Sequence, residues 1–400
     1  MDGWYYMWKR KKHKYVINII RPIFKLYFKV KYNCSFDDAI SFPEGALFIS
    51  NHVTTLDPFM IGELSKEHIY YMTNTDLFDH FILGKLIEFL VKPIPKQKGK
   101  KSDLQAIRNC MKVANEGSSI CVFVEGNRTF TGELCYFDDS IAKLAKVLKK
   151  PVVLCNIEGG YGIDPRFAKG VSKGKMHVGI KKIIQPDELS DMMIEDLFKE
   201  IKESINVDNF NYYKEYKGKN RALYLERVVY KCPICKKEHT LYTKGNKIIC
   251  SSCGLEVNYN SDLTLSSSNE QFDFKYIKDW YNYQIEEIKK LDIKDEDLIY
   301  SEEVTLVNPR KYKSKKKIGK GLLEFYGDKL VFKLNKETLE FSFDDIEEMA
   351  ILGKKKMNFY VENKTYQFFG DKKINMLKYV NMFYLIRNNK RGNSNDFMGI

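Results

Sequence analysis

Residues 46–58 read Ala-Leu-Phe-Ile-Ser-Asn-His-Val-Thr-Thr-Leu-Asp-Pro. The first five form an apolar run with the length of a buried strand. The Asp57-Pro58 pair has the form of a helix start, with the aspartate as N-cap and the proline in the first helical position. Apolar runs alternate with helical patterns further along the chain, which predicts strands at 119–124, 151–157 and 175–183 and helices at 101–116 and 140–149. This alternation predicts an α/β fold with a mostly parallel sheet and flanking helices.

Five segments can be distinguished along the chain. Residues 1–32 are basic and aromatic with a helical pattern, and residues 33–220 form the expected α/β domain. Clustered cysteines occupy 228–262, and a helical connector with a basic linker is expected at 263–314. Short strand patterns followed by one helical stretch predict a small β-rich module at 315–392, whose order of elements resembles a pleckstrin-homology-like barrel. Its expected strands are 321–326, 329–334, 339–343, 357–361 and 365–369.

The charge and the cysteine count restrict the class of protein. The chain has 66 lysines and arginines against 53 aspartates and glutamates, a formal net charge of +13. A surplus of this size favours an anionic partner, whether acidic lipid, nucleic acid, a phosphorylated substrate or an acidic carrier protein. Nine cysteines, an odd number with one tight cluster, indicate a reducing compartment rather than a secreted disulfide scaffold. We therefore expect a cytoplasmic protein.

The N-terminal segment has the pattern of a helix that lies on a membrane. Polar residues recur every three or four positions and fall on one stripe of a helix: Lys14, Asn18, Arg21, Lys25 and Lys29. The remaining surface is apolar, which suits the membrane interface with its anionic headgroups. We expect peripheral attachment to the inner face of a membrane, and the alternative is docking on the protein's own core. No run of ~18 apolar residues predicts a transmembrane helix, and the basic residues argue against a signal peptide.

His52 and Asp57 are the first candidate catalytic residues, because they follow a strand at a position where α/β sheets place their active sites. A histidine titrates near neutrality and can take a proton from an attacking hydroxyl group. A nearby carboxylate can fix the tautomer of the ring and stabilise the imidazolium. The alternative is that Asp57 only caps the following helix.

A second candidate segment, Phe123-Val-Glu-Gly-Asn-Arg-Thr129, follows another apolar run. Gly126 in a turn allows the backbone to approach a ligand, and Arg128 beside it can bind a phosphate through two parallel hydrogen bonds. A surface loop with a salt bridge is the alternative interpretation.

Together, the two segments resemble the glycerol-3-phosphate and lysophosphatidate acyltransferase family, which has an Asn-His-x4-Asp block followed by Phe-Pro-Glu-Gly-Thr-Arg. The matching residues are Asn51, His52, Asp57, Phe123, Glu125, Gly126 and Arg128. Val124 and Asn127 replace the usual Pro and Thr. Residues 94–98, Ile-Pro-Lys-Gln-Lys, look similar to a third family segment, with Lys98 at the position of an arginine. The resemblance covers roughly residues 15–205.

The resemblance implies a mechanism and a set of partners. His52 is expected to deprotonate the acceptor hydroxyl, with Asp57 orienting it, so that the alkoxide attacks the thioester of acyl-CoA or acyl-carrier protein. Arg128 and Lys98 are expected to hold the acceptor phosphate, and the other substrate-binding candidates are Asn51, Glu125 and Gly126. The expected acceptor is a lysophospholipid, 1-acylglycerol-3-phosphate, giving phosphatidate in phospholipid biosynthesis. The alternative is an inactive adaptor that binds membrane or nucleic acid.

The clustered cysteines predict a zinc ribbon. Cys232-Pro-Ile-Cys235 and Cys250-Ser-Ser-Cys253 are two Cys-x2-Cys knuckles separated by 14 residues. Two such knuckles complete a tetrahedral Zn²⁺ site, which is structural because four protein thiolates leave no open position. His239 is an alternative ligand. Nucleic acid is not expected as a partner, because no aromatic and basic recognition pattern accompanies the ribbon.

Overall fold

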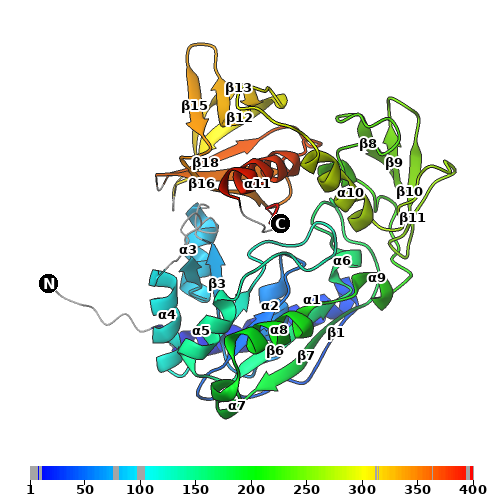
Figure 1. Ribbon diagram of the computed structural model, residues 1–400. Helices are drawn as coiled ribbons and strands as arrows, with labels where there is room; N and C mark the ends of the chain where they lie inside the picture. The colour runs from blue at the N-terminus through cyan, green and yellow to red at the C-terminus, as the bar shows by residue number, and fades with distance from the viewer. Residues whose placement is uncertain are drawn as a thin grey trace.

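The computed structural model describes residues 8, 11–74, 81–96, 104–310, 313, 315–362, 364–392 and 397–399. Figure 1 shows an α/β domain built from the N-terminal half, a small sheet around the clustered cysteines, and a larger C-terminal sheet that lies over the α/β domain. The prediction of an α/β domain followed by a β-rich C-terminal region is confirmed.

A seven-stranded sheet forms the centre of the α/β domain. Its strands are β1 (Cys34–Phe36), β2 (Leu47–Ser50), β3 (Ile69–Asn74), β4 (Ile94–Lys96), β5 (Ser119–Phe123), β6 (Val152–Glu158) and β7 (Met176–Ile184). They lie in the order β1-β7-β6-β2-β5-β3-β4, and every neighbouring pair is parallel except β6 with β7. The mostly parallel sheet is therefore confirmed. β2 is buried along its whole length, which explains why its sequence is a continuous apolar run.

Helices cover both faces of this sheet. They are α1 (Lys11–Tyr32), α2 (Asp57–Gly62), α3 (Phe81–Leu90), α4 (Leu104–Asn115), α5 (Ser140–Leu148), α6 (Gly160–Ile163), α7 (Pro186–Asp191), α8 (Ile194–Ile205) and α9 (Asn209–Tyr212). Leu47 and Ile49 of β2 share a core with α4, α5 and α8, whereas Phe48 shares a core with α1 and α2. The two cores follow from the period of two along a strand. Among the described residues, no helix combines the length and the apolarity needed to cross a membrane.

The clustered cysteines belong to a four-stranded antiparallel sheet ordered β11-β10-β9-β8. Its strands are β8 (Leu241–Lys244), β9 (Lys247–Cys250), β10 (Glu256–Tyr259) and β11 (Leu265–Ser266), and α10 (Ile277–Lys289) follows them. Trp280 of α10 is fully buried, and its Nε1–H donates to the carbonyl oxygen of Lys231 at 2.9 Å. This helix therefore packs directly against the first cysteine knuckle.

The C-terminal sheet has seven antiparallel strands in the order β15-β14-β13-β12-β18-β17-β16. They are β12 (Tyr300–Asn308), β13 (Lys316–Phe325), β14 (Lys329–Lys333), β15 (Thr338–Ser342), β16 (Ile346–Leu352), β17 (Lys356–Val361) and β18 (Lys364–Phe369). One helix, α11 (Leu377–Arg391), follows. Several strands followed by one helix is the order of elements that the sequence predicts for this module. Its resemblance to a pleckstrin-homology-like barrel stays a prediction.

Two strands of this sheet depart from the sequence prediction. β12 lies inside 263–314, which was predicted as a connector and linker, and β16 matches none of the expected strands. Both strands have irregular pairing, between Leu306 and Val307 in β12 and between Ile346 and Glu348 in β16. Such irregularities break the alternation of buried and exposed residues by which a strand is recognised. The predicted start of the module at residue 315 is therefore wrong, and the module begins with β12.

One hydrophobic core runs through all three regions. It includes Phe48 and Phe167 of the α/β domain, Trp280 beside the cysteines and Phe325 of the C-terminal sheet. Polar contacts cross the same boundary, because Arg227 donates from Nη1 to the carbonyl oxygen of Phe167 at 3.0 Å and from Nε to that of Lys372 at 3.0 Å. The regions therefore pack as one unit.

Candidate active site

His52 and Asp57 meet in the loop that joins β2 to α2. His52 Nδ1 lies 2.7 Å from Asp57 Oδ2, and the side chain of His52 is 22% exposed whereas that of Asp57 is fully buried. The carboxylate can only accept, so the ring proton belongs on Nδ1. Nε2 then keeps the lone pair that a base needs. The ring of Phe123 stacks on His52 with 4.6 Å between the centroids, which holds the imidazole in place.

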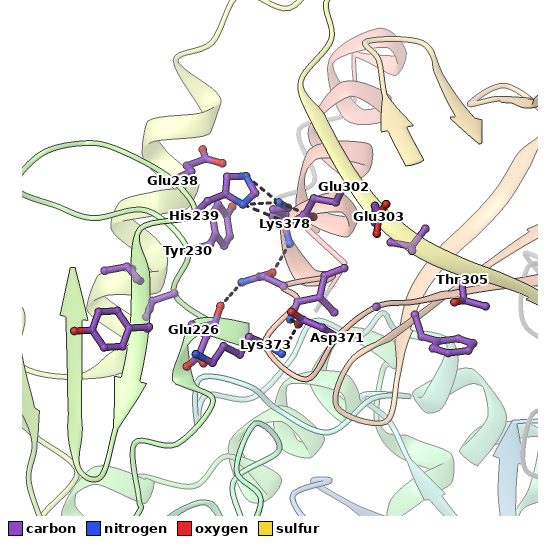
Figure 2. Close-up of a pocket in the computed structure, with 18 of the residues that line it drawn as sticks. Glu226, Tyr230, Glu238, His239, Glu302, Glu303, Thr305, Asp371, Lys373 and Lys378 are labelled. Carbon is purple, nitrogen blue, oxygen red and sulfur yellow. Dashed lines mark hydrogen bonds and ion pairs between the residues drawn. The ribbon is translucent and has the colours of Figure 1, made fainter. Parts of the chain in front are cut away.

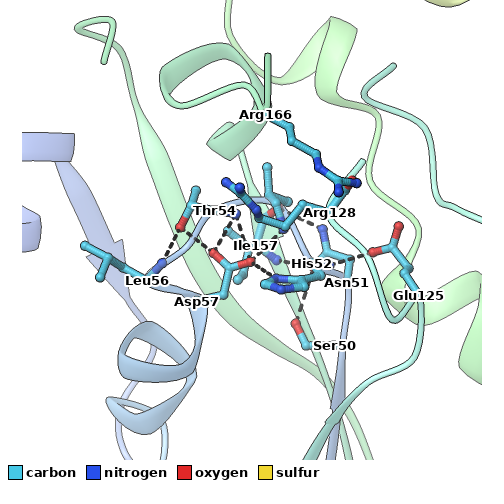
Figure 3. Close-up of polar contacts among 11 residues, drawn as sticks. Ser50, Asn51, His52, Thr54, Leu56, Asp57, Glu125, Arg128, Ile157 and Arg166 are labelled. Atoms are coloured by element: carbon cyan, nitrogen blue, oxygen red, sulfur yellow. Dashed lines mark hydrogen bonds and ion pairs between the residues drawn. The ribbon is translucent and has the colours of Figure 1, made fainter. Parts of the chain in front are cut away.

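The buried carboxylate of Asp57 faces the loop before its own helix. Asp57 Oδ2 accepts from the backbone N–H of Val53 at 2.6 Å, and Oδ1 accepts from the hydroxyl of Thr54 at 2.6 Å (Figure 3). These bonds satisfy a charge that would be costly to bury alone. The N-cap position of α2 is taken by Leu56, without a side-chain cap. The interpretation of Asp57 as a helix cap is therefore wrong, while Pro58 does occupy the first turn.

Asn51 connects the end of β2 to β6. Its Nδ2 donates to the carbonyl oxygen of Ile157 at 3.1 Å, and its Oδ1 accepts from the backbone N–H of Ile157 at 2.8 Å. Both groups of the amide are thus used within the protein, and the side chain is buried. Asn51 fits a role in positioning the His52 loop better than the predicted contact with substrate.

The side chain of Glu125, like that of Asn51, bonds to the backbone of the protein itself. Its Oε1 accepts from the backbone N–H of His52 at 2.5 Å, and its Oε2 accepts from that of Cys135 at 2.7 Å. Burial raises the pKa of Glu125 to about 7, although these two hydrogen bonds oppose the rise. Glu125 therefore joins the two predicted segments, and it too fits a positioning role better than direct substrate binding.

Arg128 is the candidate that remains open to a ligand. It follows a turn in which Gly126 has a φ of 63°, a conformation that favours glycine. Burial lowers the pKa of Arg128, and the charges of Asp164 and Asp57 oppose that shift. Its Nη1 is buried and has no hydrogen-bond partner. Because an unpaired buried N–H of a cation is unfavourable, this position suits an anionic ligand.

Lys98, the remaining predicted phosphate ligand, lies outside the described residues. The strand before it, β4, ends at Lys96 and is parallel to β3, which is parallel to β5. Because parallel strands end at the same edge of a sheet, β4 ends at the edge that carries His52 and Arg128.

Arg166 is a buried residue near the site that the sequence analysis does not identify. Its Nη1 donates to the carbonyl oxygen of Arg128 at 2.7 Å, and its guanidinium carbon lies 4.1 Å from the centroid of the Phe130 ring. Burial lowers its pKa to about 9, and the charge of Arg128 adds to this effect. Nothing in the surrounding sequence marks Arg166, because its partners are carbonyl oxygens from distant segments.

The four predicted zinc ligands lie together. The Sγ atoms of Cys232, Cys235, Cys250 and Cys253 all lie within 4.8 Å of one another. The distances from Cys232 to Cys253 and from Cys235 to Cys250 are both 3.7 Å. Tetrahedral zinc with Zn–S bonds of ~2.3 Å requires sulfur atoms about 3.8 Å apart. The donor set and its spacing therefore fit Zn²⁺.

A cavity of about 640 Å³ lies between the cysteine-containing sheet and the C-terminal sheet (Figure 2). Lys378 Nζ lies 2.9 Å from Glu302 Oε2, and His239 Nδ1 lies 3.4 Å from Glu302 Oε1. Burial alone would raise the pKa of Glu302, but hydrogen bonds from His239 and Lys378 outweigh it and lower the pKa to about 2. His239 thus contacts an ion pair, and the cysteine cluster found among the described residues does not include it.

Comparisons with known proteins agree on the N-terminal half. The acyltransferase family model matches residues 31–158. Chloroplastic 1-acyl-sn-glycerol-3-phosphate acyltransferases of Brassica napus and Arabidopsis thaliana are 24% and 25% identical over 207 residues, and each match covers 50% of this chain. The chain spans 58% and 56% of the lengths of these relatives. The solved 1-acyl-sn-glycerophosphate acyltransferase of Thermotoga maritima matches 48% of this chain and 79% of its own, with 20% identity and a TM-score of 0.41.

Proposed function

Because the acyltransferase family model matches residues 31–158, we propose that this chain moves a fatty acyl group from a thioester to a lysophospholipid. The acceptor we propose is 1-acylglycerol-3-phosphate, which would give phosphatidate, and the donor is acyl-CoA or acyl-carrier protein. The pairing of His52 Nδ1 with the buried Asp57 carboxylate at 2.7 Å carries the proposal, because it leaves Nε2 as a base.

In the proposed reaction, the two substrates and the His52–Asp57 pair carry the transfer of the proton and of the acyl group. His52 Nε2 takes the proton of the acceptor hydroxyl, and the hydroxyl oxygen attacks the carbonyl carbon of the thioester. Asp57 stabilises the imidazolium that forms. The carbon–sulfur bond then breaks, and the departing thiolate takes the proton from His52. Asn51 and Glu125 keep the loop of the base fixed through their bonds to Ile157 and Cys135.

Arg128 supports a phosphorylated acceptor over a neutral one. Its unpartnered buried Nη1 suits a phosphate oxygen, and an arginine can bind two such oxygens at once. Lys98 lies outside the described residues, and we keep it as a proposed second phosphate ligand because it follows β4, which ends at the same edge of the sheet.

The test is an acyl-transfer assay with the purified full-length chain. Lysophosphatidate is offered with acyl-CoA and, separately, with acyl-carrier protein, and phosphatidate is measured. We expect phosphatidate with at least one donor, and a much lower rate with monoacylglycerol, which has no phosphate. A chain that consumes neither thioester, yet binds vesicles or RNA tightly, would instead support the adaptor interpretation.

We also propose that α1 holds the protein peripherally on the inner, cytoplasmic face of a membrane. One side of α1 packs on the protein, where Phe28 is fully buried and Phe24 stacks on Phe59 with 4.4 Å between the centroids. The other side exposes apolar residues at helical spacing: Tyr15, Ile19, Ile23, Leu26 and Val30, which are 64–77% exposed. Exposed Lys25 and Lys29 lie next to these residues, where they can meet anionic headgroups. Docking on the core and docking on a membrane are thus compatible.

Charged residues on this stripe should weaken membrane binding. We expect the double variant Ile23→Asp/Leu26→Asp to bind vesicles with a phosphatidylserine fraction at least about 30-fold more weakly, because two apolar side chains no longer enter the lipid. Co-sedimentation with vesicles measures the effect. Met193, which is 64% exposed at the start of α8, provides the matched control, and Met193→Asp should bind like the wild type. Equal binding by both variants would contradict the membrane proposal.

A further inference from the structure

A turn of the C-terminal sheet packs against the loop that carries Arg128. Arg166 donates from Nη1 to the carbonyl oxygen of Arg128, from Nη2 to that of Ile351 at 2.7 Å, and from Nε to that of Gly353 at 2.8 Å. One buried guanidinium therefore joins the phosphate-binding candidate to the hairpin turn between β16 and β17. Gly353 has a φ of 64°, which allows the tight turn that presents its carbonyl oxygen.

The next residue in this turn, Lys354, is directed into the α/β domain. Its Nζ donates to the carbonyl oxygen of Ala168, two residues beyond Arg166. An ammonium group has three donors, so two remain for other partners. The segment that contains Arg166 and Ala168 also carries Asp164, the first residue after α6. The turn thus brings Lys354 of the C-terminal sheet into contact with the segment 164–168 of the α/β domain.

The charges around this lysine are not balanced. Burial raises the pKa of Asp164, and the positive charges of Lys354 and Arg128 oppose the rise. Burial lowers the pKa of Lys354, Asp164 opposes that change, and Arg128 adds to it. Three cations, Lys354, Arg128 and the buried Arg166, thus face two carboxylates, Asp164 and Asp57, and Arg166 is bonded mainly to carbonyl oxygens. A phosphate group would supply the missing negative charge.

We propose that Lys354, contributed by the C-terminal sheet, binds the phosphate of the acceptor together with Arg128. This inference rests on the proposed function and adds to it a binding residue from outside the acyltransferase domain. The acceptor site is then complete only when the β16–β17 turn is docked on the Arg166 segment. The C-terminal region is in this way a part of the enzyme's specificity for phosphorylated acceptors.

The adjacent lysine provides a matched control. Lys355 lies in the same turn and is also partly buried, but its charged neighbours are Arg227, Asp371 and other lysines, and neither Asp164 nor Arg128 is among them. Lys354→Ala, Lys355→Ala and Lys354→Arg are compared with the wild type in the full-length chain. The KM for lysophosphatidate, the KM for the acyl donor, kcat and the unfolding temperature are measured for each.

We expect Lys354→Ala to raise the KM for lysophosphatidate about tenfold or more, with the KM for the donor unchanged. The two alanine variants should unfold at the same temperature. Lys354→Arg should restore most of the affinity, and Lys355→Ala should behave as the wild type. Equal KM values for the two alanine variants would overturn the inference while leaving the proposed function intact.

A binding measurement separates this inference from the reaction itself. Calorimetry with a short-chain lysophosphatidate needs no turnover, so it remains informative if the wild type makes no phosphatidate. In that case, weaker binding by Lys354→Ala than by Lys355→Ala would still support the phosphate site, and the absence of phosphatidate would contradict only the proposed reaction. Equal binding by the two variants would overturn the inference.

Discussion

Replacing His52 by alanine should reduce the rate of acyl transfer at least about 1,000-fold, with little change in the affinity for lysophosphatidate. Removal of a general base costs an enzyme this order of magnitude, because the acceptor hydroxyl must then lose its proton to water. The side chain of His52 is partly exposed and its loop is held by Asn51 and Glu125, so the fold should survive the change. Steady-state kinetics on the full-length chain measure the effect.

His177 offers a matched control for this experiment. It is also partly exposed and also lies near a carboxylate, with Nε2 3.3 Å from Asp37 Oδ1, but it belongs to β7. His177→Ala should therefore transfer acyl groups at the rate of the wild type. If His52→Ala kept the wild-type rate, the assignment of the base would be wrong and the His52–Asp57 contact would be structural.

Loss of zinc should destabilise the whole chain. We expect the purified protein to contain one zinc per chain, and we expect Cys250→Ser or a strong chelator to remove it. Structural zinc sites contribute about 10–16 kcal/mol of apparent binding free energy, which exceeds the stability of many domains. The buried Trp280 bonds to the carbonyl oxygen of Lys231 beside Cys232, so its fluorescence should change when the metal leaves. Elemental analysis and thermal unfolding complete the measurement.

The control for this second experiment is a cysteine outside the cluster. Cys34 is buried in β1 of the α/β domain, and Cys34→Ala should retain one zinc per chain. Acyl transfer by the zinc-free protein should also fall, because the C-terminal sheet packs on the cysteine region through the shared core. A fully stable wild-type chain without metal would contradict the zinc assignment.

The contact between His52 and Asp57 could be predicted from the sequence because the two residues are close together in the chain, in the loop after β2 and at the start of α2. His52 and Asp57 are five residues apart after a buried strand, so one turn of the chain is enough to bring their side chains together. The direction of the Asp57 carboxylate could not be predicted in the same way. It depends on where the backbone N–H groups of Val53 and Thr54 point, which the loop conformation decides.

Contacts between distant segments account for what the sequence did not reveal. Arg166 is separated from Arg128 by 38 residues and from Ile351 by 185, and no local pattern relates the three. β16 is rich in Glu, Met and Ala, which favour helices, and its strand conformation follows from pairing with β17. The roles of Asn51 and Glu125 likewise depend on their partners across the sheet, Ile157 and Cys135.

The bonds of Arg166 relate the active site to the order in which the chain is made. The segments with His52 and Arg128 are synthesised well before Ile351 and Gly353, which accept from Arg166 and lie 185 and 187 residues after it in the chain. Until they emerge, Arg166 lacks two of its acceptors and the common core is missing its C-terminal part. The nascent α/β domain can therefore form its sheet early, but Arg166 gains all of its partners only after the β16–β17 turn has folded against it.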